Sequence, residues 1–369
     1  MRTEVVRLDP RRFATRIDNV PIGLHTIGND RGIAVAVTNY GARILQIVVP
    51  DREGRPGDIA QGYESIEQVL GGQPSMGAFI GRYANRIAAR AFEIDGEVHV
   101  LTVNETVTDP ARPRRSTLHG GTRGSRHRSF AVTRVAPDSL RMEVRFRDGE
   151  DGFPGDLAVD VEYSVTGEDE LVITYEAVAG ARATVANFTV HTFFNLCGDP
   201  GATVGPTRLV IPATNVLEVD SALLPTGSLR AVEGTPLDFR RSRAIESRID
   251  IACDLLAAGD GYDHYYVIDQ AVPGELVLHA RAYDPRSGRV LDVRSTEPGI
   301  QFYSGNGLDG RRSRDIGKGG VVYGRRTAFC LEPSHYPDSV HHPAFPTTVL
   351  AAYERYRGEI RYRFSTARI

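Results

Sequence analysis

Short segments in which every second residue is apolar recur along the chain and limit its fold more than any other feature. In residues 142–147 and 360–364, apolar residues alternate with charged ones. Such a segment can form a β-strand that buries one face and exposes the other to solvent. The chain shows no repeating alternation of strands and helices, which disfavours a doubly wound parallel sheet. We therefore predict an all-β protein, a large single-domain antiparallel β-sandwich.

Turn residues separate these segments and predict several hairpins. Residues 92–101 alternate around Asp95-Gly96, a dipeptide typical of tight hairpin turns. Further hairpins are predicted from residues 159–177 and 276–293, each of which contains a turn rich in Gly, Asp or Pro.

Segments without the alternating pattern are few. Helical patterns are confined to residues 65–70 and 243–258, and residues 104–117, which are rich in Arg, Pro and Thr, are predicted as a surface insertion.

Composition and cysteine content exclude several classes of function. The chain has 369 residues and a net charge of -3, so neither nucleic acid nor an anionic membrane is an expected partner. Three cysteines without a C-x-x-C motif argue against a disulfide framework and against a zinc site. No apolar run is long enough to cross a bilayer, and the N-terminus lacks the apolar region of a secretory signal. A cytoplasmic location is therefore expected.

Six short motifs carry polar residues that the strand pattern does not require. Taken singly, each residue has a structural explanation, such as a turn residue, a buried histidine or a capping side chain. His335, His341 and His342 are not counted among the candidate residues, because they lack helical ligand spacing and are predicted to have a surface or packing role rather than a metal-binding one. The six motifs are GRYANRIAAR with Asn85 and Arg86, TLHGG with His119, NFTVHTFFNLCG with His191, GYDHYYV with Asp263, GIQFYSGN with Gln301, and FCLEPSHYPD with Glu332.

Glu332 is the least expected of these residues. It follows the apolar residues 328–331 and precedes a proline, which predicts a carboxylate at the buried end of a strand. Partial burial raises the pKa of a carboxyl group toward the range that suits a general base. A core carboxylate paired with one of the many arginines is the alternative interpretation.

In series, these motifs resemble the aldose 1-epimerase, or galactose mutarotase, family. The resemblance runs from about Phe13 to Phe364 and also includes TNYGA, VPDREG, FEIDGE, GEDGFPGDL, LPTG and LDFR, all in the same order. It implies a galactose mutarotase-like supersandwich over residues 13–369, preceded by an N-terminal extension at residues 1–12. It also implies an enzyme that interconverts the α and β anomers of a free hexose, such as galactose or glucose, with no cofactor and no metal.

The resemblance implies a role for each candidate residue. Glu332 stands at the position of the family's general base, which would take the proton of the C1 hydroxyl. His191 stands at the position of the general acid, which would protonate the ring oxygen. The remaining five match positions that contact sugar hydroxyls, and they are Asn85, Arg86, His119, Asp263 and Gln301.

Departures from the family pattern leave the sugar open. Val190, Ser334 and Gly307 replace residues that are usual in the family, and the last two are predicted to widen the pocket. One alternative is a hexose-6-phosphate 1-epimerase, for which residues 109–115 or 311–314 would supply the basic side chains at the pocket mouth. The other is a sugar-binding protein without catalytic activity. Either a monomer or a homodimer is expected.

Overall fold

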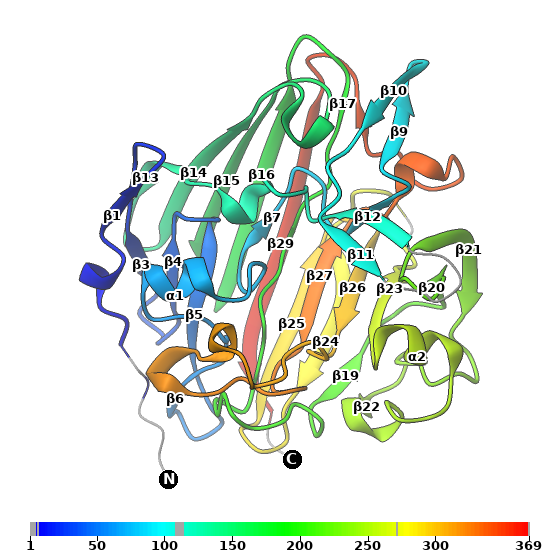
Figure 1. The fold of residues 1–369 in the computed structure, drawn as a ribbon. Helices are drawn as coiled ribbons and strands as arrows, with labels where there is room; N and C mark the ends of the chain where they lie inside the picture. The colour runs from blue at the N-terminus through cyan, green and yellow to red at the C-terminus, as the bar shows by residue number, and fades with distance from the viewer. Residues whose placement is uncertain (1–4, 6, 108–113, 271, 368–369) are drawn as a thin grey trace.

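The computed structural model describes residues 5, 7–107, 114–270 and 272–367, and these form an almost entirely β structure (Figure 1). Every pairing between named strands is antiparallel. The largest sheet has nine strands, in the order β13 (Ala131–Val135), β14 (Ser139–Phe146), β15 (Leu157–Val165), β16 (Glu170–Ala179), β29 (Arg355–Thr366), β25 (Arg289–Ser295), β24 (Val277–Tyr283), β19 (Arg208–Val210) and β22 (Arg243–Ala244).

Two smaller sheets lie in front of the nine-stranded sheet in the view of Figure 1. The four-stranded sheet has the order β3 (Leu24–Gly28), β4 (Ala34–Thr38), β5 (Arg43–Pro50) and β6 (Pro56–Asp58). The five-stranded sheet has the order β21 (Pro225–Ala231), β20 (Asn215–Val219), β23 (Asp263–Val267), β26 (Gly299–Tyr303) and β27 (Cys330–Ser334).

The remaining elements are short and connect or flank these layers. A three-stranded sheet contains β11 (Glu105–Val107), β12 (Arg114–Leu118) and β8 (Arg86–Ala88). Four two-stranded pairs are β1 (Thr15–Ile17) with β2 (Val20–Ile22), β9 (Ala91–Ile94) with β10 (Glu97–Val100), β7 (Phe79–Ile80) with β18 (Thr189–Val190), and β17 (Thr184–Val185) with β28 (Val349–Leu350). The α-helices of the described residues are α1 (Ile66–Gly71) and α2 (Asp254–Gly259). Single 3₁₀ turns are η1 (Pro10–Arg12), η2 (Ser125–His127), η3 (Glu150–Gly152), η4 (Ile245–Ser247), η5 (Ser313–Asp315), η6 (Lys318–Gly320) and η7 (Ser339–His341).

The main hydrophobic core lies between the layers. One cluster of buried side chains includes Val35 of β4, Val161 and Ile173 of the nine-stranded sheet, and Ile300 and Leu331 of the five-stranded sheet. Alternate burial along β15 shows the period of two that the sequence predicted. The predicted all-β sandwich is therefore confirmed.

Local predictions were confirmed at the hairpins and failed where tertiary pairing took over. The hairpins β9–β10, β15–β16 and β24–β25 form as expected, and so does α1, which begins after the N-cap Ser65. The helix predicted over 243–258 is confirmed only at its end, because Arg243–Ala244 pairs with β19, η4 is a single 3₁₀ turn, and the α-helix is confined to α2. The insertion predicted over 104–117 is partly wrong, because its two ends pair as β11 and β12, while residues 108–113 lie outside the described residues.

Among the described residues, no helix is both long and apolar enough to cross a bilayer.

Lys318, the chain's single lysine, links the η6 segment to the four-stranded sheet through hydrogen bonds and an ion pair. Its side chain is 5% exposed, and its Nζ donates to the carbonyl oxygens of Leu45 and Ala60 at 2.6 and 2.7 Å. The same Nζ lies 2.6 Å from a carboxylate oxygen of Asp58. Burial lowers the pKa of Lys318, and the charge of Asp58 opposes that shift.

We expect Lys318→Met to lower the free energy of unfolding by about 3–5 kcal/mol, because it leaves Asp58 without its buried partner. Denaturant unfolding measures this change. Arg312→Met is the control from the same loop, since its ion pair with Asp309 is exposed, and it should change stability by less than about 1 kcal/mol. Equal effects of the two substitutions would contradict a structural role for Lys318.

Candidate active site

The floor of the candidate site is the face of the five-stranded sheet that points away from the nine-stranded sheet. On β26, Ile300 and Phe302 enter the core, so the pleat turns Gln301 and Tyr303 to the opposite face. The antiparallel register places Gln301 directly across from Glu332 on β27, and Tyr303 across from Asp263 on β23. Period-two alternation and register thus gather these side chains on one surface.

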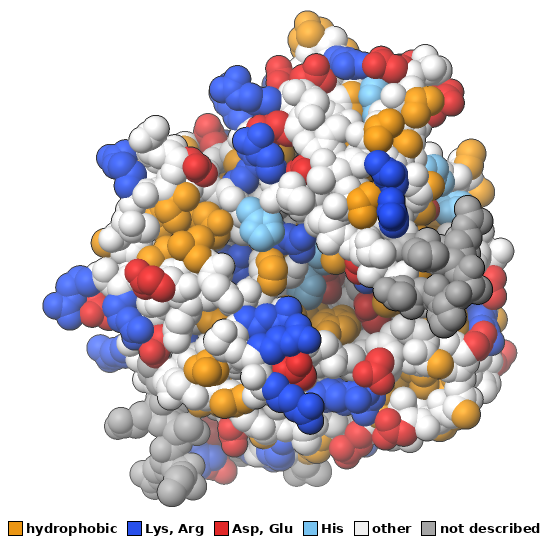
Figure 2. Space-filling view, viewed as in Figure 1, with side chains coloured by type: hydrophobic (Ala, Val, Ile, Leu, Met, Phe, Trp, Pro, Cys, Tyr) orange, Lys and Arg blue, Asp and Glu red, His pale blue; other side chains and the backbone are white. Residues whose placement is uncertain are grey.

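Loops from the other half of the chain form the walls. Asn85 and Arg86 lie at the start of β8, His119 follows β12, and His191 follows β18. Asn85 and His119 both have left-handed backbone conformations, with φ of 59° and 53°. All seven residues singled out from the sequence line one cavity of about 340 Å³, a volume suited to a small ligand. In the space-filling view, the face above β26 and β27 is hollowed near its centre, with a histidine inside (Figure 2).

Glu332 and His191 form the centre of this cavity. Glu332 lies in the middle of β27 rather than at its end, and it is 4% exposed. Among the described residues, its ion-pair partner is His191, whose Nε2 lies 3.6 Å from Oε1, and not an arginine. Burial and the nearby Asp263 raise the pKa of Glu332 well above its usual range, while Arg86 opposes this.

The pKa of His191 shifts in the opposite direction. Burial, together with the positive charge of Arg126, lowers the pKa of His191 to about 3. Its ring stacks on Phe193 at 5.0 Å between centroids, and its Nδ1 is buried without a hydrogen-bond partner. Burial therefore favours the neutral carboxyl group of Glu332 beside the neutral imidazole of His191. In this state the two groups share one exchangeable proton, which lies on the carboxyl group.

The tautomer of His119 follows from one contact. The backbone N–H of Asn85 donates to His119 Nδ1 at 3.1 Å, so that nitrogen carries no proton. Burial and the charge of Arg126 lower the pKa of His119 well below its usual value. The ring is therefore neutral, with its proton on Nε2, and it can donate a hydrogen bond to a ligand oxygen.

Hydrogen bonds fix the remaining polar groups. Asn85 Nδ2 donates to Gln301 Oε1 at 3.2 Å, and Gln301 Nε2 donates to Asp263 Oδ1 at 2.6 Å. Arg86 donates through Nε and Nη2 to both oxygens of Glu105, at 2.7 and 2.8 Å. This bidentate pair holds the guanidinium of Arg86 at the cavity wall.

Sequence reasoning missed two charged residues of the site. Glu105, which positions Arg86, lies in the segment predicted as a surface insertion. The only signal for its role was its position opposite Ser116 in the pairing of β11 with β12. Arg126 lines the cavity from η2, but it is one of many arginines and no spacing distinguishes it. Conversely, Val190, Ser334 and Gly307 are not among the residues that line the cavity, so the lining gives no support to the expectation that Ser334 and Gly307 widen it.

Cys330 brings a third potential ligand atom to the central pair. Single ligand atoms of His191, Cys330 and Glu332 all lie within 4.8 Å of one another. The spacing argument from the sequence did not foresee this group, because the residues come from β27 and from the segment after β18. The three cysteines of the chain form no disulfide.

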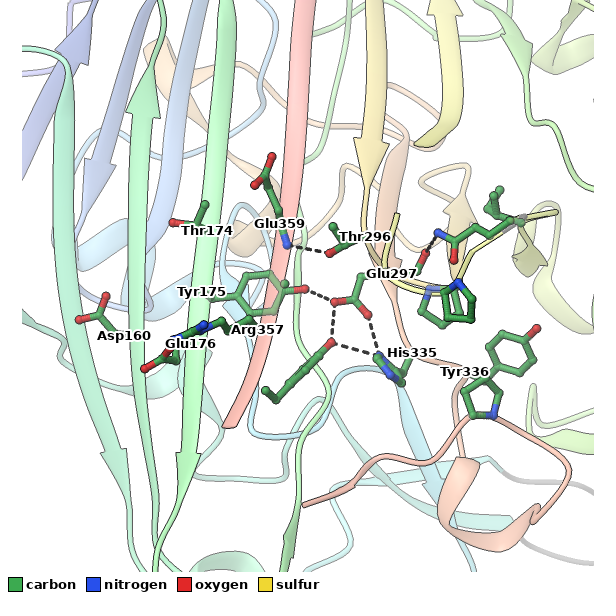
Figure 3. Close-up of a pocket in the computed structure, with 18 of the residues that line it drawn as sticks. Asp160, Thr174, Tyr175, Glu176, Thr296, Glu297, His335, Tyr336, Arg357 and Glu359 are labelled. Carbon is green, nitrogen blue, oxygen red and sulfur yellow. Dashed lines mark hydrogen bonds and ion pairs between the residues drawn. The ribbon is translucent and has the colours of Figure 1, made fainter. Parts of the chain in front are cut away.

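A larger cavity of about 1050 Å³ lies over β16 and β29 and contains a second buried carboxylate (Figure 3). Glu297 accepts hydrogen bonds from the hydroxyls of Tyr175 and Tyr356 and lies 2.6 Å from Nδ1 of His335. Burial opposes ionisation, but the charge and hydrogen bond of His335 keep the pKa of Glu297 below its usual value. This saturated group anchors the chain just after β27, and His335 has the packing role predicted for it.

Comparisons with known proteins agree with the fold. The sequence model of the Aldose 1-epimerase family matches residues 23–363. Galactose mutarotase of Homo sapiens is 36% identical over 335 residues, which cover 91% of this chain and 92% of that protein. Aldose 1-epimerase of Escherichia coli (strain K12) is 33% identical over 349 residues, covering 94% and 96%.

A solved structure shows the same architecture. The GalM/aldose epimerase homologue from C. elegans superposes with a TM-score of 0.84 at 29% identity, and the match covers 94% of this chain and all of that one. A family match across most of the chain, relatives above 30% identity and a shared fold lead to one conclusion: this chain belongs to the aldose 1-epimerase family.

Proposed function

We propose that this protein is a mutarotase, which interconverts the α and β anomers of a free hexose such as galactose or glucose. The observation that carries the proposal is the contact of 3.6 Å between Glu332 and His191 inside one buried cavity. The names of the human and Escherichia coli relatives support the same activity. We further propose a cytoplasmic enzyme that uses no metal or cofactor.

The proposed reaction moves one proton at each of two neighbouring oxygens. In the reactive form of the pair, its one proton has moved from Glu332 to His191. The carboxylate of Glu332 takes the proton of the C1 hydroxyl, and C1=O forms as the C1–O5 bond breaks. Nε2 of His191 gives its proton to O5. Rotation about C1–C2 then exposes the other face of the aldehyde, and the reverse transfers close the ring. The two oxygens share C1, which matches two catalytic groups in direct contact.

The other five residues are proposed to hold the sugar. Asp263 and Gln301 offer an acceptor and an amide beside Glu332, and His119 offers its Nε2 proton. Arg86, held by Glu105, can donate to hydroxyl oxygens without losing its own partner. Asn85 orders this group through its contacts with Gln301 and His119.

Both alternatives find less support. Arg311, Arg312 and Arg314, offered for a phosphate, do not line the cavity, and residues 108–113 lie outside the described residues. A protein that only binds sugar would not need a buried carboxyl group in contact with a buried imidazole. Burying two ionisable groups costs free energy, and sugar binding alone does not require it.

Glu332→Gln should lower kcat by about 10²–10⁴-fold, because it keeps the shape of the side chain and removes the proton acceptor. His191→Asn should show a comparable loss. Polarimetry of galactose and glucose, with and without a chelator, gives the rates, and equal rates in both conditions are expected for catalysis without a metal.

Glu297→Gln is the matched control, because Glu297 is equally buried but lies in the other cavity. It should reduce the melting temperature while leaving kcat per folded molecule unchanged. A Glu332→Gln variant that behaves like this control would show that Glu332 is structural.

Asp263→Ala and Arg86→Ala should mainly raise KM, because each removes charge-assisted hydrogen bonds worth about 1.5–3 kcal/mol. Arg86→Ala should also lower kcat if the guanidinium stabilises charge on the ring oxygen. Steady-state kinetics separates the two parameters. Losses confined to kcat in both variants, with sugar affinity unchanged, would contradict the positioning role.

The pH dependence of kcat/KM should follow the proton content of the Glu332–His191 pair. The pair gains a second proton only near the low pKa of His191, about 3, so activity should persist well below neutral pH. It loses its only proton as pH rises through the raised pKa of Glu332, which sets an alkaline limb. Asp263→Asn removes a charge that raises this pKa, so the alkaline limb should move to lower pH. A limb that stays in place would contradict this assignment.

A further inference from the structure

Arg126 is a buried cation without a buried anion to balance it. The residue is 7% exposed, and its guanidinium donates to Ser75 Oγ at 2.9 Å and to the Leu118 carbonyl at 3.4 Å. Its Nε has no partner, and within the described part of the chain no carboxylate lies within ion-pair distance of it. Burial lowers the pKa of Arg126 to about 10, and only the distant effect of Glu105 opposes this.

Among the residues that the structure describes, no other anion is available to this group. Glu105 is already bonded to Nε and Nη2 of Arg86 and to the hydroxyl of Ser116. Arg43, whose guanidinium donates to the carbonyl of Arg126, is also buried and bonds only to carbonyl oxygens. A buried charge is costly unless it is paired, so this part of the cavity is prepared for an anion that arrives with the ligand.

The charges divide the cavity into two ends. Asp263 is bonded to Gln301, which lies directly across from Glu332 in the sheet. Arg126 instead donates to the carbonyl of Leu118, the residue before His119, and the ring of His119 lies 5.4 Å from that of His191. Arg126 lines the cavity together with Gln73 and Ser75 of the loop before β7. The carboxylates therefore lie at one end, and the uncompensated cation lies at the end beyond the histidines.

Pyranose geometry identifies which part of a sugar reaches that end. In the proposed reaction, Glu332 contacts O1 and His191 contacts O5. C2 and C3 extend from C1, whereas the exocyclic C6 is attached to C5, the ring neighbour of O5. A group on C6 therefore lies on the His191 side, toward Arg126, while the hydroxyls of C2 and C3 lie toward Asp263.

We propose that Arg126 binds a carboxylate on C6, so that the preferred substrates are hexuronates rather than neutral hexoses. This inference rests on the proposed mutarotase function and specifies its substrate class. Nη1 and Nη2 of Arg126 each donate one hydrogen bond to the protein, and each retains a second N–H. Two parallel N–H groups on one planar guanidinium match the two oxygens of a planar carboxylate.

The test compares anomerisation of galacturonate, galactose and galactose 6-phosphate by the wild-type enzyme. We expect kcat/KM to be highest for galacturonate. Arg126→Gln should reduce the ratio of kcat/KM for galacturonate to that for galactose by about 10- to 100-fold, the effect of losing hydrogen bonds to a charged group. Arg123→Gln, an exposed change of equal charge outside the cavity, should leave this ratio unchanged.

A measurement on the wild-type protein keeps the test valid if Arg126→Gln fails to fold. The methyl glycosides of galacturonate and galactose cannot open their rings, so calorimetry reports binding alone, and the galacturonate derivative should bind at least 10-fold more tightly.

Equal affinities together with equal kcat/KM would overturn the inference and leave the proposed function intact. Preference for the 6-phosphate would overturn the choice of a carboxylate. If no sugar is accelerated, the proposed function fails, and the calorimetric comparison still decides the ligand preference.

Discussion

The contact between Glu332 and His191 is the interaction on which the site depends. Two side chains from distant segments meet at 3.6 Å because an antiparallel bridge between Phe194 and Phe329 places the segment after β18 beside β27. Their burial removes the water that would stabilise either charge, so the carboxyl group and the imidazole share one proton. A pair of this kind can exchange protons with a ligand without a net change of charge. The sandwich supplies the dry surroundings, and the strand register supplies the alignment.

The rest of the site leaves the oxygens of Glu332 available to a ligand. Glu297 has a similar burial and a histidine beside it, but two tyrosine hydroxyls and His335 occupy its oxygens. Glu332 has no such partners among the described residues, and the neighbouring polar groups bond to one another instead. The difference between a structural and a reactive carboxylate is thus the number of satisfied acceptor positions, not the depth of burial.

The sequence predicted the strands better than the connections, for a physical reason. Alternation along β15 and turn residues at Asp95-Gly96 are local signals, and they were sufficient. The segment at 243–258 has a helical pattern, yet pairing of Arg243–Ala244 with β19 overrides it. Seven of the residues that line the cavity were identifiable from motifs, whereas Glu105 and Arg126 were not. The roles of these two residues depend on the charged groups that they face in the folded structure, and no local sequence pattern specifies those contacts.

The position of Arg126 joins substrate choice to the proton chemistry. The positive charge of Arg126 is among the causes that lower the pKa of His191. The imidazolium of His191 is therefore harder to form when no anion is bound to Arg126. A ligand carboxylate bound to Arg126 would cancel most of that field, because opposite charges in contact act together as a dipole at a distance. The proton shared by the pair would then move more easily onto His191, where ring opening requires it. An anionic substrate would therefore help to charge the acid that opens its own ring, and a neutral hexose would not.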